Sequence, residues 1–271
     1  VRLRGGSSSP ADDGPPPRES PVFVVGFPRS GTTMLEQMLD AHPSMRSMDE
    51  RAFIQALADR MQRDGLRYPD DLPGLDAAYR ERLRRAYRDM VTRVVTIAPG
   101  QRIVDKNPLN LLRLPMMHRL FPQARTILAL RHPCDVILSC YMQNFRSPAF
   151  QILCSTLERL ARGYVNAMRH WIHHADLLRP NLLTLRYEDL LDDFDGHVRR
   201  IGEFLELDDA RAMSGFHEHA RGKGFISTPS YAAVVEPPNK KAVGRWRRYE
   251  KYFAPVLPIL DPILRHWNYD A

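Results

Sequence analysis

The sequence has little cysteine and no long apolar segment. Its three cysteines, Cys134, Cys140 and Cys154, lack the spacing of a metal site, and so small a number argues against a disulfide framework. They indicate instead a reducing compartment or buried thiols. No apolar run is long enough to span a membrane, no secretory signal is visible, and no segment repeats. We therefore expect a cytoplasmic location without membrane contact.

The remaining composition is typical of a globular chain with a basic surface. Hydrophobic residues make up 44% and charged residues 26% of the 271 positions, so one large α/β domain can bury a full core. The net charge of +7 indicates an anionic ligand or partner, or only a soluble basic surface. Charge alone does not choose among a nucleotide, a sulfated substrate and a nucleic acid.

The two ends of the chain differ in character. Residues 1–20 are rich in Gly, Ser, Pro, Asp and Arg and have no apolar period, which predicts a disordered linker or tail. A single domain is expected over residues 21–271. Because the chain begins with Val1, we expect that an upstream domain or targeting signal has been removed.

From Pro21 onward, short apolar runs alternate with longer amphipathic segments. This alternation predicts a three-layer α/β fold in which helices flank a central parallel sheet. Ligands bind such sheets beyond the carboxyl ends of the strands, where Arg29, Lys106, Arg131 and Tyr187 are expected. The predicted strands are 22–25, 103–104, 125–130 and 181–185, and the predicted helices are 32–42, 50–64, 76–97, 109–120, 133–146, 150–177, 188–206 and 241–252.

The most informative segment is Gly26-Phe-Pro-Arg-Ser-Gly-Thr-Thr33, which joins the first strand to a helix. Backbone N–H groups and the positive end of a helix dipole make such a turn an anion cradle. The segment nearly matches the phosphate-binding loop of nucleoside triphosphatases, but Thr32 stands where that motif has lysine, and the cation is Arg29 inside the loop. The alternative is an ordinary glycine-bounded turn capped by Ser30 or Thr32.

Together with Leu130-Arg-His-Pro-Cys-Asp-Val-Ile-Leu-Ser139, this string resembles the sulfotransferase superfamily. Those enzymes transfer the sulfuryl group of 3′-phosphoadenosine 5′-phosphosulfate (PAPS). The likeness is greatest to the tyrosylprotein sulfotransferases and to bacterial domains found after tetratricopeptide repeats, and it implies a P-loop-like fold. It implies that Arg131 and Ser139 hold the 3′-phosphate; the alternative is a surface pair of Arg131 with Asp135. The 5′-phosphosulfate would bind the loop residues Arg29, Ser30, Gly31, Thr32 and Thr33.

Two further segments match catalytic motifs of the same family. Asp105-Lys-Asn-Pro108 resembles the motif whose lysine, here Lys106, contacts the transferring group. Glu50 lies at the family spacing from Arg29 for the general base, with Asp49 as its rival. No histidine follows Lys106, which favours a carboxylate base. The alternative reading of both acids is that they complement a helix dipole.

The segment from Ser227 to Trp246 resembles the C-terminal motif that closes over the nucleotide. The resemblance puts Ser230 near the bridging oxygen and Arg245 at the 3′-phosphate, with Lys240 and Lys241 adding positive charge. The alternative is an amphipathic helix that packs through Trp246, Tyr249, Phe253 and Val256. Tyr187 matches a position near the adenine or 3′-phosphate, or it is a buried structural tyrosine.

The resemblance implies in-line transfer from PAPS to an acceptor hydroxyl, with 3′-phosphoadenosine 5′-phosphate as product and no metal required. The acceptor is a peptide tyrosine, a carbohydrate or a small metabolite, and no nucleic acid is expected. A P-loop kinase and a non-catalytic domain that binds nucleotide or sulfated polymer remain alternatives. His170 and His174, like His217 and His219, have no evident third metal ligand, so no metal site is expected.

Overall fold

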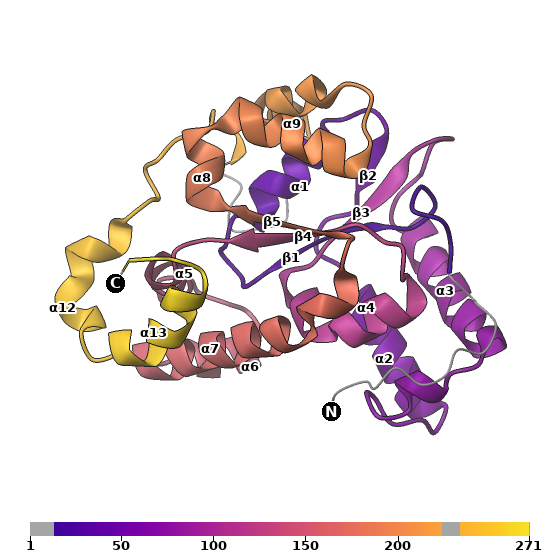
Figure 1. Ribbon diagram of the computed structural model, residues 1–271, viewed down its shortest axis with the longest axis horizontal. Helices are drawn as coiled ribbons and strands as arrows, with labels where there is room; N and C mark the ends of the chain where they lie inside the picture. The colour runs from indigo at the N-terminus through magenta and orange to yellow at the C-terminus, as the bar shows by residue number, and fades with distance from the viewer. Residues whose placement is uncertain (1–13, 224–233, 271) are drawn as a thin grey trace.

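The computed structural model describes residues 14–223 and 234–270 (Figure 1). Its centre is a five-stranded sheet in which every pairing is parallel, in the order β2-β3-β1-β4-β5. Helices cover both faces, so the predicted three-layer α/β fold is confirmed. The strands are β1 (Val22–Gly26), β2 (Met45–Ser47), β3 (Arg102–Lys106), β4 (Thr126–Leu130) and β5 (Leu182–Arg186).

Figure 1 shows α1, α8 and α9 on one face of the sheet and α2, α3, α4 and α7 on the other. The α-helices are α1 (Thr32–Asp40), α2 (Phe53–Arg63), α3 (Ala77–Thr92), α4 (Leu114–Leu120), α5 (Pro133–Tyr141), α6 (Pro148–Leu153), α7 (Leu157–His174), α8 (Tyr187–Asp192), α9 (Phe194–Leu205), α10 (Phe216–Gly222), α12 (Glu250–Phe253) and α13 (Leu257–His266). The 3-10 helices among the described residues are η1 (Leu72–Gly74), η2 (Pro108–Arg113), η3 (Ala175–Leu178), η4 (Ala210–Gly215) and η5 (Arg245–Tyr249).

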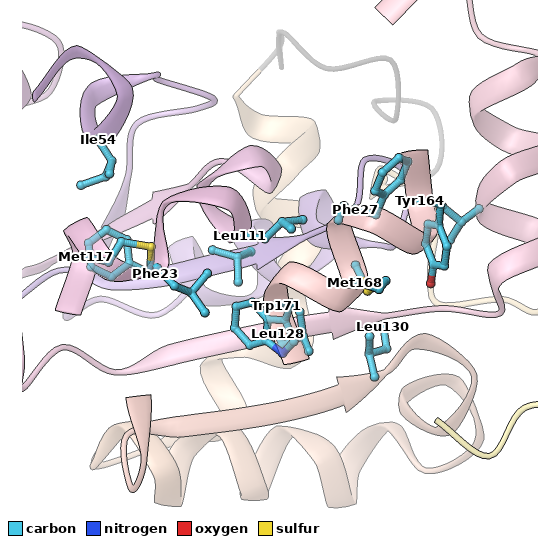
Figure 2. Close-up of a cluster of buried hydrophobic side chains, with 14 of the residues drawn as sticks. Phe23, Phe27, Ile54, Leu111, Met117, Leu128, Leu130, Tyr164, Met168 and Trp171 are labelled. Carbon is cyan, nitrogen blue, oxygen red and sulfur yellow. The ribbon is translucent and has the colours of Figure 1, made fainter. Parts of the chain in front are cut away.

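The central strand β1 is apolar throughout because both of its faces are buried. Val22 and Val24 point into a cluster with α1, α9 and α10, whereas Phe23 and Val25 point into the larger cluster on the opposite face. Figure 2 shows Phe23 and Trp171 within that larger cluster. Two-sided burial fixes the register of β1 and therefore the position of the loop that follows it.

The chain order of the strands creates a natural binding position. From β1 the chain builds β2 and β3 on one side of the sheet, and then β4 and β5 on the other. Ligands bind open α/β sheets where the winding reverses in this way, beyond the carboxyl ends of the strands. Gly26, the last residue of β1, permits this geometry, because a Cβ there would lie 2.6 Å from the carbonyl oxygen of Ala129 on β4.

Several predicted elements differ from the structure. The short edge strand β2 was not predicted, nor were α10 and α13. The segment predicted as one helix over 150–177 is α6 and α7, because the side chain of Thr156 caps a new helix start by accepting from the N–H of Arg159. The predicted helix 241–252 is wrong: Gly244 has a φ of 69°, and η5 and α12 follow it.

No helix within residues 14–223 and 234–270 is both long enough and apolar enough to cross a membrane.

Candidate active site

The loop between β1 and α1 presents the start of α1 to the carboxyl edge of the sheet. Gly31 occupies the N-cap position with a φ of 94°, and no described side chain caps the helix there. The alternative of a turn capped by Ser30 or Thr32 is therefore wrong. A Cβ on Gly31 would lie 2.8 Å from the ring of Tyr187, so the close approach of this ring requires glycine. An uncapped first turn orients its N–H groups and its positive dipole end toward an incoming anion.

Two adjoining hollows lie above this loop. The larger has a volume of about 440 Å³ and the smaller, which we call the arginine recess, about 140 Å³. Both are lined by Arg29, Arg131, Ser139 and Arg245, which come from three distant parts of the chain. The larger hollow, here called the main cavity, is also lined by Gly31, Thr32, Thr33, Glu50, Asn107, Tyr187 and Ala242.

A third hollow, of about 650 Å³, lies at the opposite end of the strands. Its charged lining is mixed in sign, with Arg18, Arg88 and Arg102 facing Glu19, Glu206 and Asp208. None of the predicted site residues that the structure describes lies there. We therefore place the candidate site at the two hollows above the β1–α1 loop, although the third hollow is larger.

The arginine recess is held together by hydrogen bonds among its own residues. Arg29 Nε donates to Ser139 Oγ over 3.0 Å, and Arg131 Nη1 donates to the carbonyl oxygen of Arg29 over 3.1 Å. Arg131 Nη2 donates to the carbonyl oxygen of Ala242, while its Nε has no hydrogen-bond partner among the described residues. Burial lowers the pKa of Arg29, and the neighbouring Arg131 lowers it further. So many cations in one place favour an anionic group such as phosphate.

Asp135 does not pair with Arg131 on the surface, so that alternative is wrong. Both residues are buried, and the Asp135 carboxylate accepts the backbone N–H of Gly244 over 2.7 Å and that of Trp246 over 3.0 Å. This clamp sets the backbone on either side of Arg245. The third arginine of the recess is thus positioned by an acid from the same α5 segment that carries Ser139.

Lys106 lies beneath the main cavity rather than on its surface. Its ammonium is fully buried and contacts Glu50 Oε1 at 2.7 Å and Glu36 Oε2 at 3.1 Å. Glu36, in α1, is also fully buried, whereas the Glu50 side chain is 44% exposed and lines the cavity. Lys106 thus reaches the cavity through Glu50 and is not itself among the described lining residues.

The pKa shifts of this cluster follow from burial and charge. Burial raises the pKa of Glu36 to about 7, although Lys106 acts to lower it. Burial alone would lower the pKa of Lys106, but Glu36 and Glu50 outweigh it, so the net shift is upward. Lys106 therefore remains an ammonium ion.

The rival acids have other positions. Asp49 has a φ of 58°, which turns the chain so that Glu50, and not Asp49, is among the described residues lining the cavity. Asp105, the residue before Lys106, is enclosed in the core. There it accepts hydrogen bonds from Tyr87 Oη over 2.9 Å and Asn110 Nδ2 over 3.1 Å. No group of three potential His, Cys, Asp or Glu metal ligands occurs among the described residues.

The C-terminal motif is only partly as predicted. Lys240 pairs with Asp192 and Lys241 pairs with Glu236, so neither contributes an uncompensated charge. Trp246, Phe253 and Val256 are buried, but Tyr249 is exposed and does not belong to that packing face. Tyr187 lines the main cavity, with the Arg131 guanidinium 5.3 Å from its ring centre. Ser230 lies outside the described residues.

Residues 21–211 match the profile of the family described as "Sulfotransferase family". The chain belongs to the sulfotransferase family. A putative protein-tyrosine sulfotransferase of Caenorhabditis briggsae is 24% identical over 258 residues, which cover 93% of this chain and 90% of that protein. An uncharacterized protein of Aquifex aeolicus is 30% identical over 258 residues, but the match spans 90% of this chain and 33% of the longer Aquifex protein.

Solved structures agree with this sulfotransferase in fold. The sulfotransferase domain of the Synechococcus PCC 7002 olefin synthase has a TM-score of 0.61 at 23% identity, covering 94% of this chain and 98% of that one. A mouse sulfotransferase complexed with PAP has a TM-score of 0.54 at 18% identity, covering 93% and 90%.

Neither motif nor periodicity singles out Glu36 in this sulfotransferase, although it is buried against Lys106. It lies one turn after Thr32 in a helix that is otherwise read from its apolar residues Met34, Leu35, Met38 and Leu39. The one indication is that an acidic residue lies in a helix that packs against the sheet on one side and against α10 on the other. Such an acid needs a buried partner, and Lys106 is that partner.

Proposed function

We propose that this sulfotransferase transfers the sulfuryl group of PAPS to an acceptor hydroxyl. The observation that carries the proposal is the arginine recess, in which Arg29, Arg131, Arg245 and Ser139 converge beside the open start of α1. Two anion-binding positions side by side suit a ligand with two separate anionic groups. PAPS has a 3′-phosphate and a 5′-phosphosulfate, whereas ATP has its phosphates in a single chain.

The residues fit such a donor on structural grounds. Among the described residues that line the recess, Asp135 is the single carboxylate, and its two oxygens are engaged by backbone N–H groups. Arg131 Nε has no hydrogen-bond partner among the described residues. We assign the 3′-phosphate to Arg131, Ser139 and Arg245, and the 5′-phosphosulfate to Arg29 and the loop from Ser30 to Thr33. Tyr187, over Gly31, is assigned to the adenosine side.

When bound, PAPS would supply an activated sulfuryl group with 3′-phosphoadenosine 5′-phosphate as the leaving group. Glu50 is the proposed base because its partly exposed carboxylate lines the cavity and can accept the proton of an acceptor hydroxyl. Lys106 holds the Glu50 carboxylate in place through the 2.7 Å contact. Arg29 and Lys106 supply positive charge to the transferring group. A contribution of Ser230 to the bridging oxygen stays a prediction.

We propose that no divalent metal is required. Thr32 replaces the lysine of the nucleoside-triphosphatase loop, and both oxygens of Asp105 are used inside the core. The proposed acceptor is a peptide tyrosine, supported by the similarity to a putative protein-tyrosine sulfotransferase and by the apolar cavity wall of Leu109, Phe145 and Phe150. A carbohydrate or small metabolite is the alternative acceptor.

Calorimetry with three ligands tests the donor assignment. We expect 3′-phosphoadenosine 5′-phosphate to bind tightly with or without Mg²⁺, and Mg·ATP and heparin to bind much more weakly. Preference for Mg·ATP would indicate a kinase, and binding of heparin alone would indicate a non-catalytic domain. Incubation with labelled PAPS and a panel of tyrosine peptides, carbohydrates and small hydroxyl compounds, followed by mass spectrometry, identifies the acceptor.

A further inference from the structure

One ammonium and two carboxylates form a triad beneath the main cavity: Glu36, Lys106 and Glu50. Lys106 and Glu36 are completely buried, and only Glu50 reaches the cavity. Lys106 contacts both carboxylates, at 3.1 Å and 2.7 Å. One carboxylate would be enough to neutralise the charge of Lys106. Neutralisation of the lysine therefore does not explain why a second carboxylate contacts it.

The second carboxylate becomes necessary when Glu50 acts as a base. A protonated Glu50 is neutral and no longer balances the lysine, and a buried ammonium without a counter-ion is strongly unfavourable. We propose that Glu36 is the counter-ion that keeps Lys106 paired while Glu50 holds the proton taken from the acceptor hydroxyl. This inference rests on the proposed function and makes Glu36 a positioning residue that acts through Lys106.

The proton balance is simple. The acceptor O–H bond breaks, its proton bonds to the Glu50 carboxylate, and the acceptor oxygen bonds to the sulfuryl group as the bond from sulfur to the bridging oxygen of PAPS breaks. Lys106 stays protonated and Glu36 stays ionised throughout, and Glu50 afterwards releases the proton to water. If Glu36 were already protonated, transfer to Glu50 would leave Lys106 without any anion, so turnover requires ionised Glu36.

This requirement predicts a pH dependence near neutrality. Burial raises the pKa of Glu36 to about 7; Asp49 raises it too, whereas Lys106 and Lys223 lower it. The buried Asp105 also faces Glu36, and burial raises the pKa of Asp105 to about 7. On the cavity side, Glu50 faces the guanidinium of Arg29. The wild-type kcat should therefore rise with pH through neutrality as Glu36 ionises.

The first test is the pH profile of the Glu36→Gln variant. We expect the near-neutral rise in kcat to disappear and kcat at pH 8 to fall about tenfold or more, with the KM for PAPS unchanged. Gln37→Leu is the matched control, because Gln37 is the next buried residue of α1 and contacts Lys223 instead of Lys106. A Glu36→Gln profile parallel to that of the wild type overturns the proposal.

Glu36→Asp separates charge from packing and serves if Glu36→Gln does not fold. It keeps the anion but shortens its reach, so the near-neutral rise should persist at a lower kcat. Loss of that rise in Glu36→Asp also overturns the proposal.

A titration that needs no turnover distinguishes failure of this inference from failure of the proposed function. With glutamate carboxyl carbons labelled by ¹³C, the resonance lost in Glu36→Gln identifies Glu36. In Glu50→Gln, Glu36 becomes the only counter-ion of Lys106, so its titration should move down by about one pH unit or more. If the Glu36 titration does not move in Glu50→Gln, the proposal that Glu36 and Glu50 share Lys106 as counter-ion is refuted. If the wild type transfers no sulfuryl group, the proposed function is refuted instead.

Discussion

Replacing Arg245 with alanine tests the assignment of the arginine recess most directly. Arg245 lines both the recess and the main cavity and is exposed, so its removal should leave the fold intact. The variant should lose affinity for 3′-phosphoadenosine 5′-phosphate but keep its affinity for adenosine 5′-phosphate, because only the first ligand has a 3′-phosphate.

The magnitude follows from the contact that is lost. A hydrogen bond to a charged group contributes about 1.5–3 kcal/mol, and solvent screening of an exposed arginine favours the lower end. Since about 1.4 kcal/mol corresponds to a factor of ten, the affinity for 3′-phosphoadenosine 5′-phosphate should fall about tenfold. The affinity for adenosine 5′-phosphate should change less than about twofold.

Arg248→Ala is the matched control in this experiment. Arg248 lies in the same 3-10 helix η5, is exposed, and lines neither hollow, yet its loss changes the net charge equally. Isothermal titration of both variants with both ligands gives four dissociation constants, each compared with that of the wild type. Equal losses for the two variants, or equal losses for the two ligands in Arg245→Ala, would refute the 3′-phosphate assignment.

Three further perturbations have defined outcomes. Glu50→Gln should reduce kcat by about 10²–10⁴ in the labelled-PAPS assay while product binding stays unchanged; near-normal turnover would disprove the base assignment. Gly31→Ala should lower the thermal midpoint more than Gly65→Ala, because both positions have positive φ, costing about 1–2 kcal/mol, but only Gly31 has the Tyr187 ring at 2.8 Å. Burial raises the pKa of Asp105 to about 7, so the folded state binds its proton more tightly than the unfolded state, and this carboxyl destabilises the fold as pH rises from about 4 to 7. The free energy of unfolding of Asp105→Asn, measured with urea, should therefore rise relative to that of the wild type by about 1 kcal/mol or more as pH goes from 5 to 8. A difference between the two proteins that stays constant with pH would contradict the raised pKa.

The sheet was predictable where burial on both faces leaves a continuous apolar run. This condition holds for β1 and β4, whose residues are all buried. The edge strand β2 has only three residues, and its central Arg46 is exposed, so its sequence carries no apolar pattern. The split of 188–206 into α8 and α9 depends on Asp193, whose side chain caps α9, and periodicity alone does not reveal such a break.

The candidate site was predictable in residue identity but not in contacts. The resemblance to the family motifs assigned Arg29, Arg131, Ser139 and Arg245 to one donor site, and all four line the arginine recess. The resemblance could not indicate that Lys106 is covered by Glu50 or that Glu36 lies behind it, because these contacts depend on the packing of α1 against β3. A single sequence contains no spacing that encodes such a tertiary ion pair.

The hydrogen bonds from the backbone N–H groups of Gly244 and Trp246 to Asp135 determine which fragments of this protein can be expressed. The family match ends at residue 211, yet Arg245 and Ala242 form part of the cavity wall, and Trp246 and Phe253 belong to the main core. A gene fragment cut at residue 211 would encode the recognisable loop and two of the three recess arginines but would leave the core open and the Asp135 carboxylate without its two donors. Screening libraries built from the matched region alone would then discard this enzyme as an insoluble, non-binding product.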